Sequence, residues 1–216
     1  MKYFLFVGIF IYLASITQIN AFVSQIWRRP KRRELKDEKF LRWVREITGL
    51  DIKSIWIFEM DKPLGMMPGV SWWPKMILSS RLYETFNKHE MEYVILHEAG
   101  HCLRWHMVKM GGVFLLMLVS GLSLVSLTQS WVVVIVLAVG FALLTVQINR
   151  WFEREAEEYA AEHLSDPKFM IEAVAKFRKS YEKPGLYWLI RKYFLGPNIT
   201  YGEKIAIAEG AMKRRR

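Results

Sequence analysis

The sequence predicts an α+β protein that is mostly helical, with a small β-sheet and about three transmembrane helices. Two long stretches lack charged residues, which is typical of membrane spans. Most other segments have apolar residues at helical spacing, and two short runs are rich in β-branched and aromatic residues, as strands are. Hydrophobic residues make up 52% of the 216-residue chain, above the usual ~45–50%, whereas charged residues make up an ordinary 24%. The hydrophobic excess is therefore concentrated in particular segments.

The first apolar stretch, Tyr3 to Trp27, contains no charged residue or histidine. A cleavable signal peptide is one interpretation, since Lys2 precedes the stretch and Ala21 could end it. However, the basic sequence WRRPKRR follows at once, and a dense positive cluster resists translocation. We therefore predict an uncleaved anchor over residues 1–27, with the N-terminus outside and the basic cluster in the cytoplasm.

The second apolar stretch covers the 39 residues from Gly111 to Asn149. One helix of this length would run about 58 Å, roughly twice the thickness of a bilayer core. The polar residues TQS at 128–130 divide the stretch, so we predict two crossings, residues 111–127 and 131–148, joined by a tight turn. A pair of buried helices in a soluble core is the alternative, but such helices normally carry a polar face.

These stretches divide the chain into an anchor (1–27), two polar regions (28–110 and 149–216) and a hairpin (111–148). Basic residues flank the spans on the side of the polar regions, and the turn of the hairpin carries none. The flanking residues are Arg28, Arg29, Lys31, Arg32, Arg33, Lys36, Arg104, Lys109, Arg150 and Arg154. Both polar regions are therefore expected in the cytoplasm. Contact with anionic lipid then explains the net charge of +10 without nucleic acid as a partner.

Short patterns predict the elements of the polar regions. Residues 37–48 repeat apolar residues at helical spacing, and Gly49 can end that helix. Residues 54–58 and 75–79 are predicted strands, separated by turn residues at 61–69. Further helices are expected from 81, over 89–107, over 149–164, after the break at 165–167, and from the capping box at 200–203 through 211.

Candidate metal ligands stand in the HEAGH motif at residues 97–101. On a helix, positions i and i+4 lie on one face, so the imidazoles of His97 and His101 can hold one metal ion. Glu98 lies beside that face, where a carboxylate can take a proton from water. Histidines that pair or cap within a helix would explain single residues but not this spacing. The single cysteine, Cys102, excludes a disulfide scaffold and is expected to pack in the interior.

A catalytic zinc site needs three protein ligands and one open position. The helix predicted over 149–164 offers Glu153 and Glu157, one turn apart on one face. We interpret Glu153 as the third ligand and Glu157 as a carboxylate that receives the free N–H of a ligating histidine, with Glu157 as the alternative ligand. The histidines precede the hairpin and the glutamates follow it, so only an even number of crossings brings them together. Small residues are expected to let the two helices approach closely: Ala99, Gly100, Ala156 and Ala160.

The other histidines and the neighbouring acidic residues lack partner spacing. We expect three glutamates on a solvated face: Glu155, Glu158 and Glu162. We expect three histidines at the surface or the membrane interface: His89, His106 and His163. None of them is assigned a role at the metal site.

The order of these features resembles the HtpX-type membrane zinc metallopeptidases, whose relatives include the CAAX prenyl proteases. The resemblance covers roughly Phe40 to Ala208. It rests on the run VILHEAGH, the hairpin, and NRWFEREAE at residues 149–157, which is similar to the family pattern Ser-Arg-x-x-Glu-x-x-Ala-Asp. It implies a zincin-like domain with Glu98 as the general base and one zinc ion per chain. The ligands that it implies are His97, His101 and Glu153.

The chain departs from the family pattern in three places. Glu157 replaces the aspartate, and residues 64–67 (LGMM) replace an Asn-Ala-Phe-Ala segment. Residues 197–200 (PNIT) stand where the family has Thr-His-Pro-Pro, so a histidine often found there is missing. The residue that stabilises the developing oxyanion is therefore open between Tyr201 and Arg150.

The resemblance implies an integral-membrane zinc endopeptidase that hydrolyses peptide bonds of membrane or misfolded proteins. Its substrate would lie extended along an edge strand near residues 72–79, where Trp72 and Trp73 either line the cleft or meet the membrane interface. The implied partners are polypeptides and the lipid bilayer, and the implied location is a multi-pass membrane protein with a cytoplasmic catalytic side. A catalytically silent zinc-binding sensor or scaffold of the same fold is the alternative, because the late histidine is missing.

Overall fold

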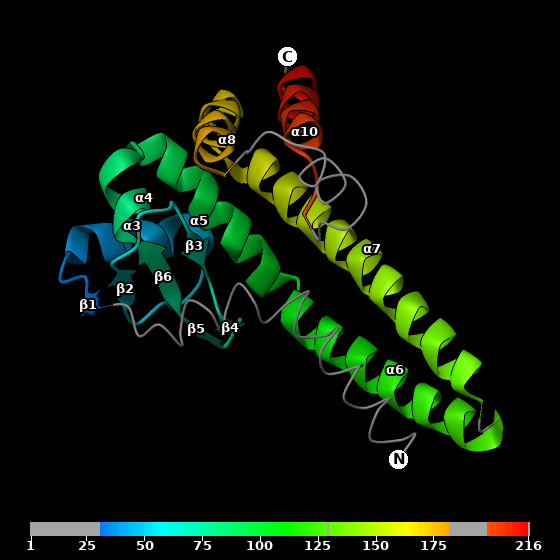
Figure 1. Ribbon diagram of the computed structural model, residues 1–216. Helices are drawn as coiled ribbons and strands as arrows, with labels where there is room; N and C mark the ends of the chain where they lie inside the picture. The colour runs from blue at the N-terminus through cyan, green and yellow to red at the C-terminus, as the bar shows by residue number, and fades with distance from the viewer. Residues whose placement is uncertain (1–30, 129, 182–197, 216) are drawn as a thin grey trace.

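A computed structural model describes residues 31–128, 130–181 and 198–215, with a mixed α/β body at one end of a long helical hairpin (Figure 1). The described strands are β1 (Arg32–Glu34), β2 (Ile55–Phe58), β3 (Gly65–Met66), β4 (Gly69–Val70), β5 (Trp73–Pro74) and β6 (Met76–Ser79). The described helices are α3 (Glu38–Thr48), α4 (Ser80–Thr85), α5 (Lys88–Leu103), α6 (His106–Thr128), α7 (Trp131–His163), α8 (Lys168–Tyr181) and α10 (Tyr201–Arg214). The predicted α+β, mostly helical fold is confirmed. The anchor predicted over residues 1–27, and with it the third crossing, lies outside the described residues.

The larger sheet has the strand order β1-β2-β6-β3, and β4 pairs with β5 in a separate two-stranded sheet. β2 and β6 run parallel, while β1 and β3 pair antiparallel at the two edges. The strands predicted at 54–58 and 75–79 are confirmed as the two central strands. An edge strand was expected near residues 72–79; for β6 this is wrong, because β6 lies between β2 and β3, whereas β5 belongs to the separate two-stranded sheet. In the larger sheet the edge strand that contacts α5 is β3, whose two residues are too few for an alternating pattern, and β4 of the smaller sheet also contacts α5.

The helix predicted over 89–107 is in fact two helices. α5 begins at a capping box, in which the Asn87 side chain accepts from the Glu90 N–H and the Glu90 carboxylate accepts from the Asn87 N–H. Arg104 and Trp105 separate α5 from α6. Trp105 has a left-handed φ of 59°, which is rare for a bulky residue. No proline marks the break, so the sequence predicted one continuous helix.

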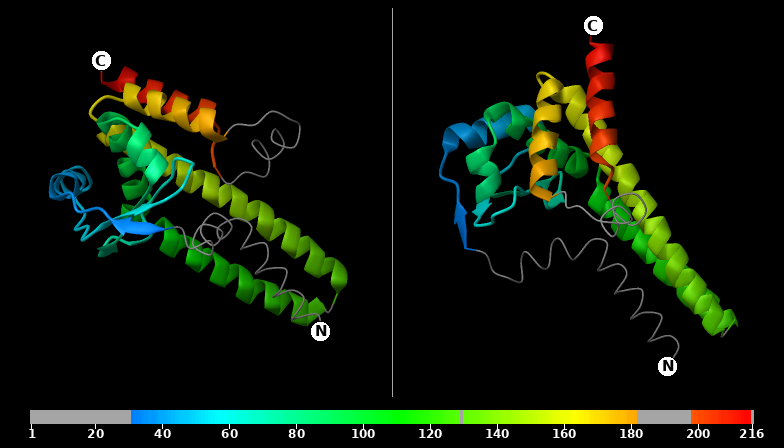
Figure 2. Two further views of the ribbon diagram at one scale, coloured as in Figure 1. Left: turned by 60° about the vertical axis from the view of Figure 1, so that its left-hand side comes forward. Right: turned by 45° about the horizontal axis from the view of Figure 1, so that its top comes forward.

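α6 and α7 run side by side away from the body (Figures 1 and 2). In each helix, only 22% of the most apolar 18-residue segment is buried. Large apolar side chains on them face outward, including Leu116 at 71% exposed and Leu127 at 80%. Helices of a soluble core would bury such side chains, so this pair has the length and the surface of a membrane hairpin.

α5 and α7 pack closely where both carry small residues. A Cβ added at Gly100 would lie 3.2 Å from the Cα of Ala156, which is tighter than most real contacts. Ala99, Ala156 and Ala160 are fully buried at this crossing. The predicted close approach of the two helices is therefore confirmed. It brings the polar face of α7 against the HEAGH segment of α5.

Candidate metal centre

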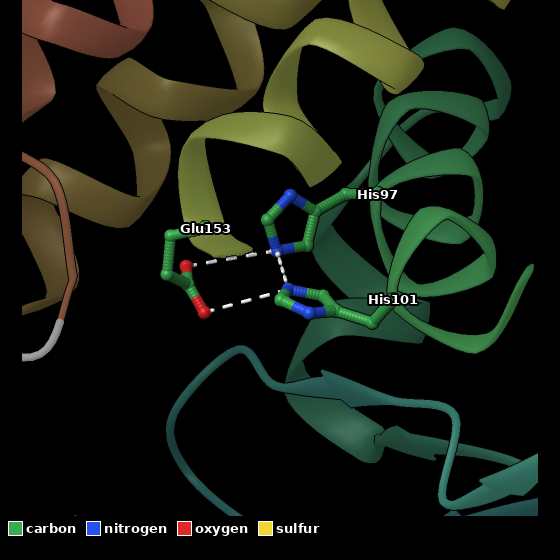
Figure 3. Close-up of side chains that lie close together, drawn as sticks. All are labelled: His97, His101 and Glu153. Atoms are coloured by element: carbon green, nitrogen blue, oxygen red, sulfur yellow. Dashed lines mark hydrogen bonds and ion pairs between the residues drawn. The ribbon is translucent and has the colours of Figure 1, made fainter. Parts of the chain in front are cut away.

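α5 and α7 bring two histidines and a glutamate together (Figure 3). His97 and His101 lie one turn apart on α5, with their Nε2 atoms 3.3 Å apart. From α7, Glu153 places Oε1 3.4 Å from Nε2 of His101 and Oε2 3.8 Å from Nε2 of His97. One donor atom from each residue lies within 4.8 Å of the other two. The structure thus gathers the three residues that the sequence predicted as ligands.

The spacing of these donor atoms fits a tetrahedral zinc ion. Zn–N bonds of ~2.0–2.1 Å at the tetrahedral angle place two ligand nitrogens ~3.3–3.4 Å apart. The two histidine nitrogens are 3.3 Å apart, and the nearer carboxylate oxygen is 3.4 Å from His101 Nε2. Two imidazoles and one carboxylate are also a donor set of catalytic zinc sites, in which the fourth position stays open. The residues present therefore fit the metal that the sequence implies.

Glu98 lies beside the two histidines and next to the strand edge. Its Oε2 accepts a hydrogen bond from the backbone N–H of Met67, the residue that follows β3, at 3.2 Å. Burial raises the pKa of the Glu98 carboxyl, although His97 and His101 act in the opposite direction. A raised pKa brings a carboxyl group closer to the range in which it can both accept and donate a proton.

Glu157 lies on the Nδ1 side of His97, whereas Glu153 lies on the Nε2 side of that ring. Its Oε1 is 3.2 Å from Nδ1 of His97, and its Oε2 accepts a hydrogen bond from the Tyr93 hydroxyl at 2.8 Å. Lys204, from α10, also donates to Oε1 of this fully buried carboxylate. The sequence analysis missed Tyr93 and Lys204. The capping box predicted where α10 starts, but a lone lysine or tyrosine carries no spacing signal.

The carboxylates of Glu153 and Glu157 favour the protonated forms of the groups around them. Burial lowers the pKa of His97, but Glu157 and Glu153 outweigh burial and raise it to about 9. Burial and Glu157 raise the pKa of Tyr93, so its hydroxyl stays protonated and remains a donor. An environment that favours a protonated imidazole also favours a divalent cation between the two histidines.

A second chain of contacts starts at the other nitrogen of His101. His106 Nδ1 lies 2.9 Å from His101 Nδ1, and His106 Nε2 lies 2.9 Å from Oε2 of Glu155. The expectations that placed His106 at the surface and Glu155 on a solvated face are wrong. His106 is only 4% exposed, because the break after α5 turns it back toward His101. Cys102 is buried, as expected.

α10 packs beside α7 through a cluster of charged side chains. Glu203, in the first turn of α10, contacts Arg150 at 3.3 Å and Arg154 at 3.0 Å. Its carboxylate also accepts from the backbone N–H of Thr200 at 2.8 Å, which completes the capping box. Arg150 is thereby fixed against α10. The choice between Arg150 and Tyr201 as the oxyanion stabiliser stays a prediction.

Comparison with known proteins decides the family. The sequence model described as peptidase family M48 matches residues 64–201, which is more than half of the chain. The chain belongs to peptidase family M48. Peptidases of this family depend on zinc. The match contains the HEAGH motif, the hairpin and Glu153.

The fold of this M48 peptidase is similar to a crystal structure of S. mikatae Ste24p. The TM-score is 0.63 at 15% sequence identity, and the match covers 96% of this chain. It covers 56% of the Ste24p chain, so the present chain spans little more than half the length of that protein. A search of curated proteins found no match. Family and fold together confirm the resemblance to membrane zinc metallopeptidases.

Proposed function

We propose that this M48 peptidase is an integral-membrane endopeptidase in which His97, His101 and Glu153 hold one zinc ion. The meeting of three donor atoms within 4.8 Å, beside the Glu98 carboxylate, carries the proposal. Glu157 supports it, since this residue contacts Nδ1 of His97 and leaves Nε2 to the metal. When bound, zinc supplies Lewis-acid chemistry: it polarises the carbonyl of the scissile bond and brings the pKa of a water molecule to about 7.

Glu98 acts first as the general base and then as the general acid. Its carboxylate takes a proton from water as the water oxygen attacks the carbonyl carbon of the substrate. The same proton then passes to the leaving amine as the C–N bond breaks. The N–H of Met67 holds one oxygen of Glu98, so the base is fixed beside the strand edge before the substrate arrives.

The substrate class is an extended polypeptide close to the membrane surface. β3 lies at the edge of the sheet and leads directly to Met67, and an edge strand can pair with an extended peptide. Glu153 lies five residues beyond Ile148, where the apolar arm ends, or about 8 Å along the helix. The polar layer of a bilayer is about 5–8 Å thick on each side. The site therefore lies close to the lipid headgroups, which favours peptide bonds in membrane proteins.

The charge distribution supports a multi-pass topology with the catalytic side in the cytoplasm. Basic residues flank the body end of the hairpin, and its turn carries no charge. Trp105 and Trp151 are 44% and 56% exposed near the same end. Exposed tryptophans are typical of the headgroup level of membrane proteins.

Casein digestion by the purified full chain in detergent tests the enzyme. We expect Glu98→Gln to lose about 10²–10⁴-fold in activity, while it retains one zinc ion per chain. The matched control is Glu162→Gln, which changes an exposed glutamate of α7 and should leave activity unchanged. Equal activity of Glu98→Gln and the wild type would exclude Glu98 as the general base.

Zinc analysis of Glu153→Ala and Glu157→Ala tests the ligands. If only the Glu157 change empties the site, the assignment of Glu153 as the third ligand is wrong.

A catalytically silent zinc-binding sensor or scaffold is the second candidate. The observation in its favour is the PNIT sequence at 197–200, which lacks the histidine of the family pattern. This candidate predicts that the wild type binds zinc and digests no casein. Zinc-dependent digestion that is lost in Glu98→Gln decides for the endopeptidase.

A further inference from the structure

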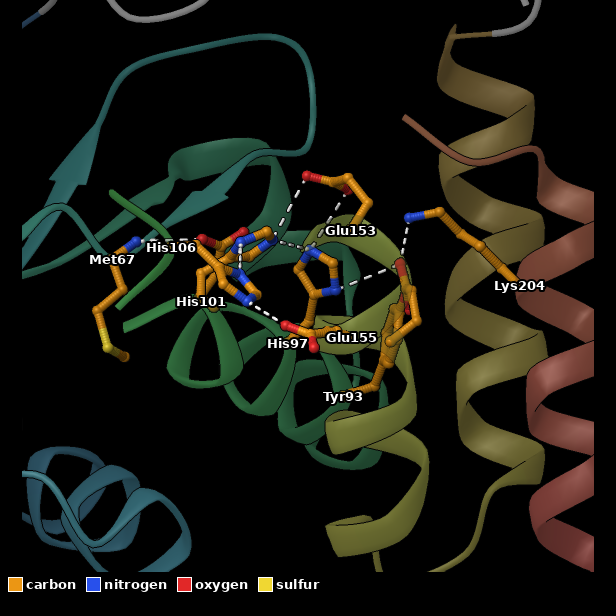
Figure 4. A network of polar contacts seen from close by, with 10 residues as sticks. Met67, Tyr93, His97, His101, His106, Glu153, Glu155 and Lys204 are labelled. Carbon is orange, nitrogen blue, oxygen red and sulfur yellow. Dashed lines mark hydrogen bonds and ion pairs between the residues drawn. The ribbon is translucent and has the colours of Figure 1, made fainter. Parts of the chain in front are cut away.

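A relay of three residues extends from the metal centre into the protein, formed by His101, His106 and Glu155 (Figure 4). His101 contacts His106 through Nδ1, the nitrogen that does not face Glu153. His106 contacts Oε2 of Glu155 through Nε2. The distance between the two Nδ1 atoms and the distance from Nε2 to Oε2 are both 2.9 Å. Neither His106 nor Glu155 has a role in the proton transfers of Glu98.

Metal binding at His101 fixes the direction of both hydrogen bonds in the relay. A nitrogen that binds a metal carries no proton, so ligation through Nε2 leaves the proton of His101 on Nδ1. This N–H donates to Nδ1 of His106, which must be unprotonated to accept it. His106 therefore carries its own proton on Nε2 and donates it to the Glu155 carboxylate. If instead His106 donated from Nδ1 to Nδ1 of His101, a neutral His101 would carry its proton on Nε2 and could not bind metal through that atom.

The backbone bends sharply to make this contact. On an uninterrupted α-helix, residues five apart point about 140° away from each other, so His101 and His106 would lie on different faces. The left-handed φ of 59° at Trp105 ends α5 and brings His106 beside His101. This conformation is unfavourable for a bulky side chain and persists only where the surrounding structure holds it. The strained residue thus lies directly before the one that contacts the ligand.

The other faces of His106 are also held. The ring of Phe152, on α7, stacks on it with the centroids 4.4 Å apart and an angle of 9° between the planes. Glu155 also lies 3.6 Å from the guanidinium of Arg104, which follows α5. Residues of α5 and α7 therefore fix one imidazole that is 4% exposed, and Arg104 in turn contacts its carboxylate partner. A histidine that only filled space would not need two directed polar contacts.

We propose that His106 and Glu155 are positioning residues that hold His101 in the tautomer and orientation required for zinc binding. The inference rests on the proposed zinc site and adds two residues that lie outside its ligand set. Partners of this kind behind a ligating histidine typically contribute 10–100-fold in metal affinity. The relay acts on the affinity for zinc, which is measured separately from peptide hydrolysis.

Zinc affinity of the purified full chain, measured by competition with a chelator, tests the relay. His106→Ala and Glu155→Ala should each weaken zinc binding about 10–100-fold. His106→Asn retains an acceptor oxygen close to the position of Nδ1, so it should recover part of the affinity lost in His106→Ala. The matched controls are His163→Ala and Glu162→Ala, which change exposed residues of α7 and should bind zinc as the wild type does. Thermal unfolding of the zinc-free variants shows that each one is folded.

The outcomes separate the relay from the proposed function. Wild-type affinity in both His106→Ala and Glu155→Ala, while His97→Ala loses zinc, overturns the relay and leaves the endopeptidase standing. Equal losses in His106→Ala and His106→Asn, together with a lowered unfolding temperature of the zinc-free protein, show a space-filling role and also overturn the relay. A wild type without stoichiometric zinc overturns the relay and the metal centre together.

Discussion

The substitution Gly100→Ala tests whether the close approach of α5 and α7 assembles the metal centre. The added methyl carbon would lie 3.2 Å from the Cα of Ala156 and 3.2 Å from Cδ1 of Tyr159. Overpacking of this kind costs about 1–3 kcal/mol, and here one opposing atom is backbone and cannot rotate away. Replacing glycine by alanine within a helix contributes about 1 kcal/mol in the other direction. We therefore expect a net loss of up to about 2 kcal/mol, which lowers the unfolding temperature of a chain this size by up to about 8 °C.

The same substitution should also weaken zinc binding, because helices that move apart carry Glu153 away from the two histidines. Thermal unfolding in detergent and chelator competition measure the two effects. Gly210→Ala is the matched control, since the nearest atom to its added methyl is 3.7 Å away at the end of the Arg214 side chain. That control should gain stability from helix propensity alone. The reasoning is refuted if Gly100→Ala behaves as Gly210→Ala does and binds zinc as tightly as the wild type.

Three further predictions follow from the charges and the exposed aromatic residues. His97 has a pKa of about 9 and is therefore protonated at pH 8 in the zinc-free protein, so zinc binding should release about 0.9 proton from it. This release adds to the roughly 0.9 proton expected from a zinc-bound water of pKa about 7, whereas an ordinary histidine would add almost none. Because protons compete with zinc for His97, the affinity for zinc should fall as the pH drops below 9. Calorimetry in buffers of different ionisation enthalpy measures the number of protons released. Lys204→Met should lower the free energy of unfolding by up to about 3–5 kcal/mol, since it removes one of the two cationic groups that contact the buried Glu157. Lys204→Arg should recover part of that loss in thermal unfolding. Trp72 is 67% exposed, and its ring centroid lies 5.1 Å from that of Trp105, next to the start of α6. Brominated lipid should therefore quench the fluorescence of Trp72. If the total quenching is the same in Trp72→Phe, Trp72 does not contact lipid, which would favour its place in the substrate cleft.

The grouping of His97, His101 and Glu153 could be predicted because its signals are local or follow from chain order. The HEAGH spacing alone puts both histidines on one helical face, and the structure has their Nε2 atoms 3.3 Å apart. Glu153 needed a second argument, namely that two segments separated by a hairpin return to the same side of a membrane. The capping box at Thr200 likewise predicted the start of α10, which begins at Tyr201. One short pattern is therefore sufficient for the two histidines and for the start of α10, whereas Glu153 requires the chain order as well.

The residues that the sequence analysis missed depend on contacts between distant parts of the chain. Trp105 has no breaker beside it, and its left-handed backbone is held by the ring of Trp72 and by the relay that begins at His106. β3 has two residues, a single repeat of the strand period, whereas a recognisable alternating pattern needs at least about four. Lys204 finds Glu157 only after α10 has packed on α7. Propensity and periodicity describe neighbours along the chain, so they cannot report such pairings.

α7 links the membrane arm to the metal centre as one continuous helix. It runs from Trp131 to His163 without interruption, so the apolar arm and Glu153 belong to the same element. The other arm is different, because the break at Trp105 separates α6 from the helix that carries the histidines. A tilt or shift of the hairpin would therefore reach the proposed site through Glu153, because the two histidines lie on α5, which the break separates from α6. Helix tilts adapt to the surrounding bilayer, so in the proposed membrane protein the position of Glu153 would depend on the bilayer as well as on the packing of α7 against α5.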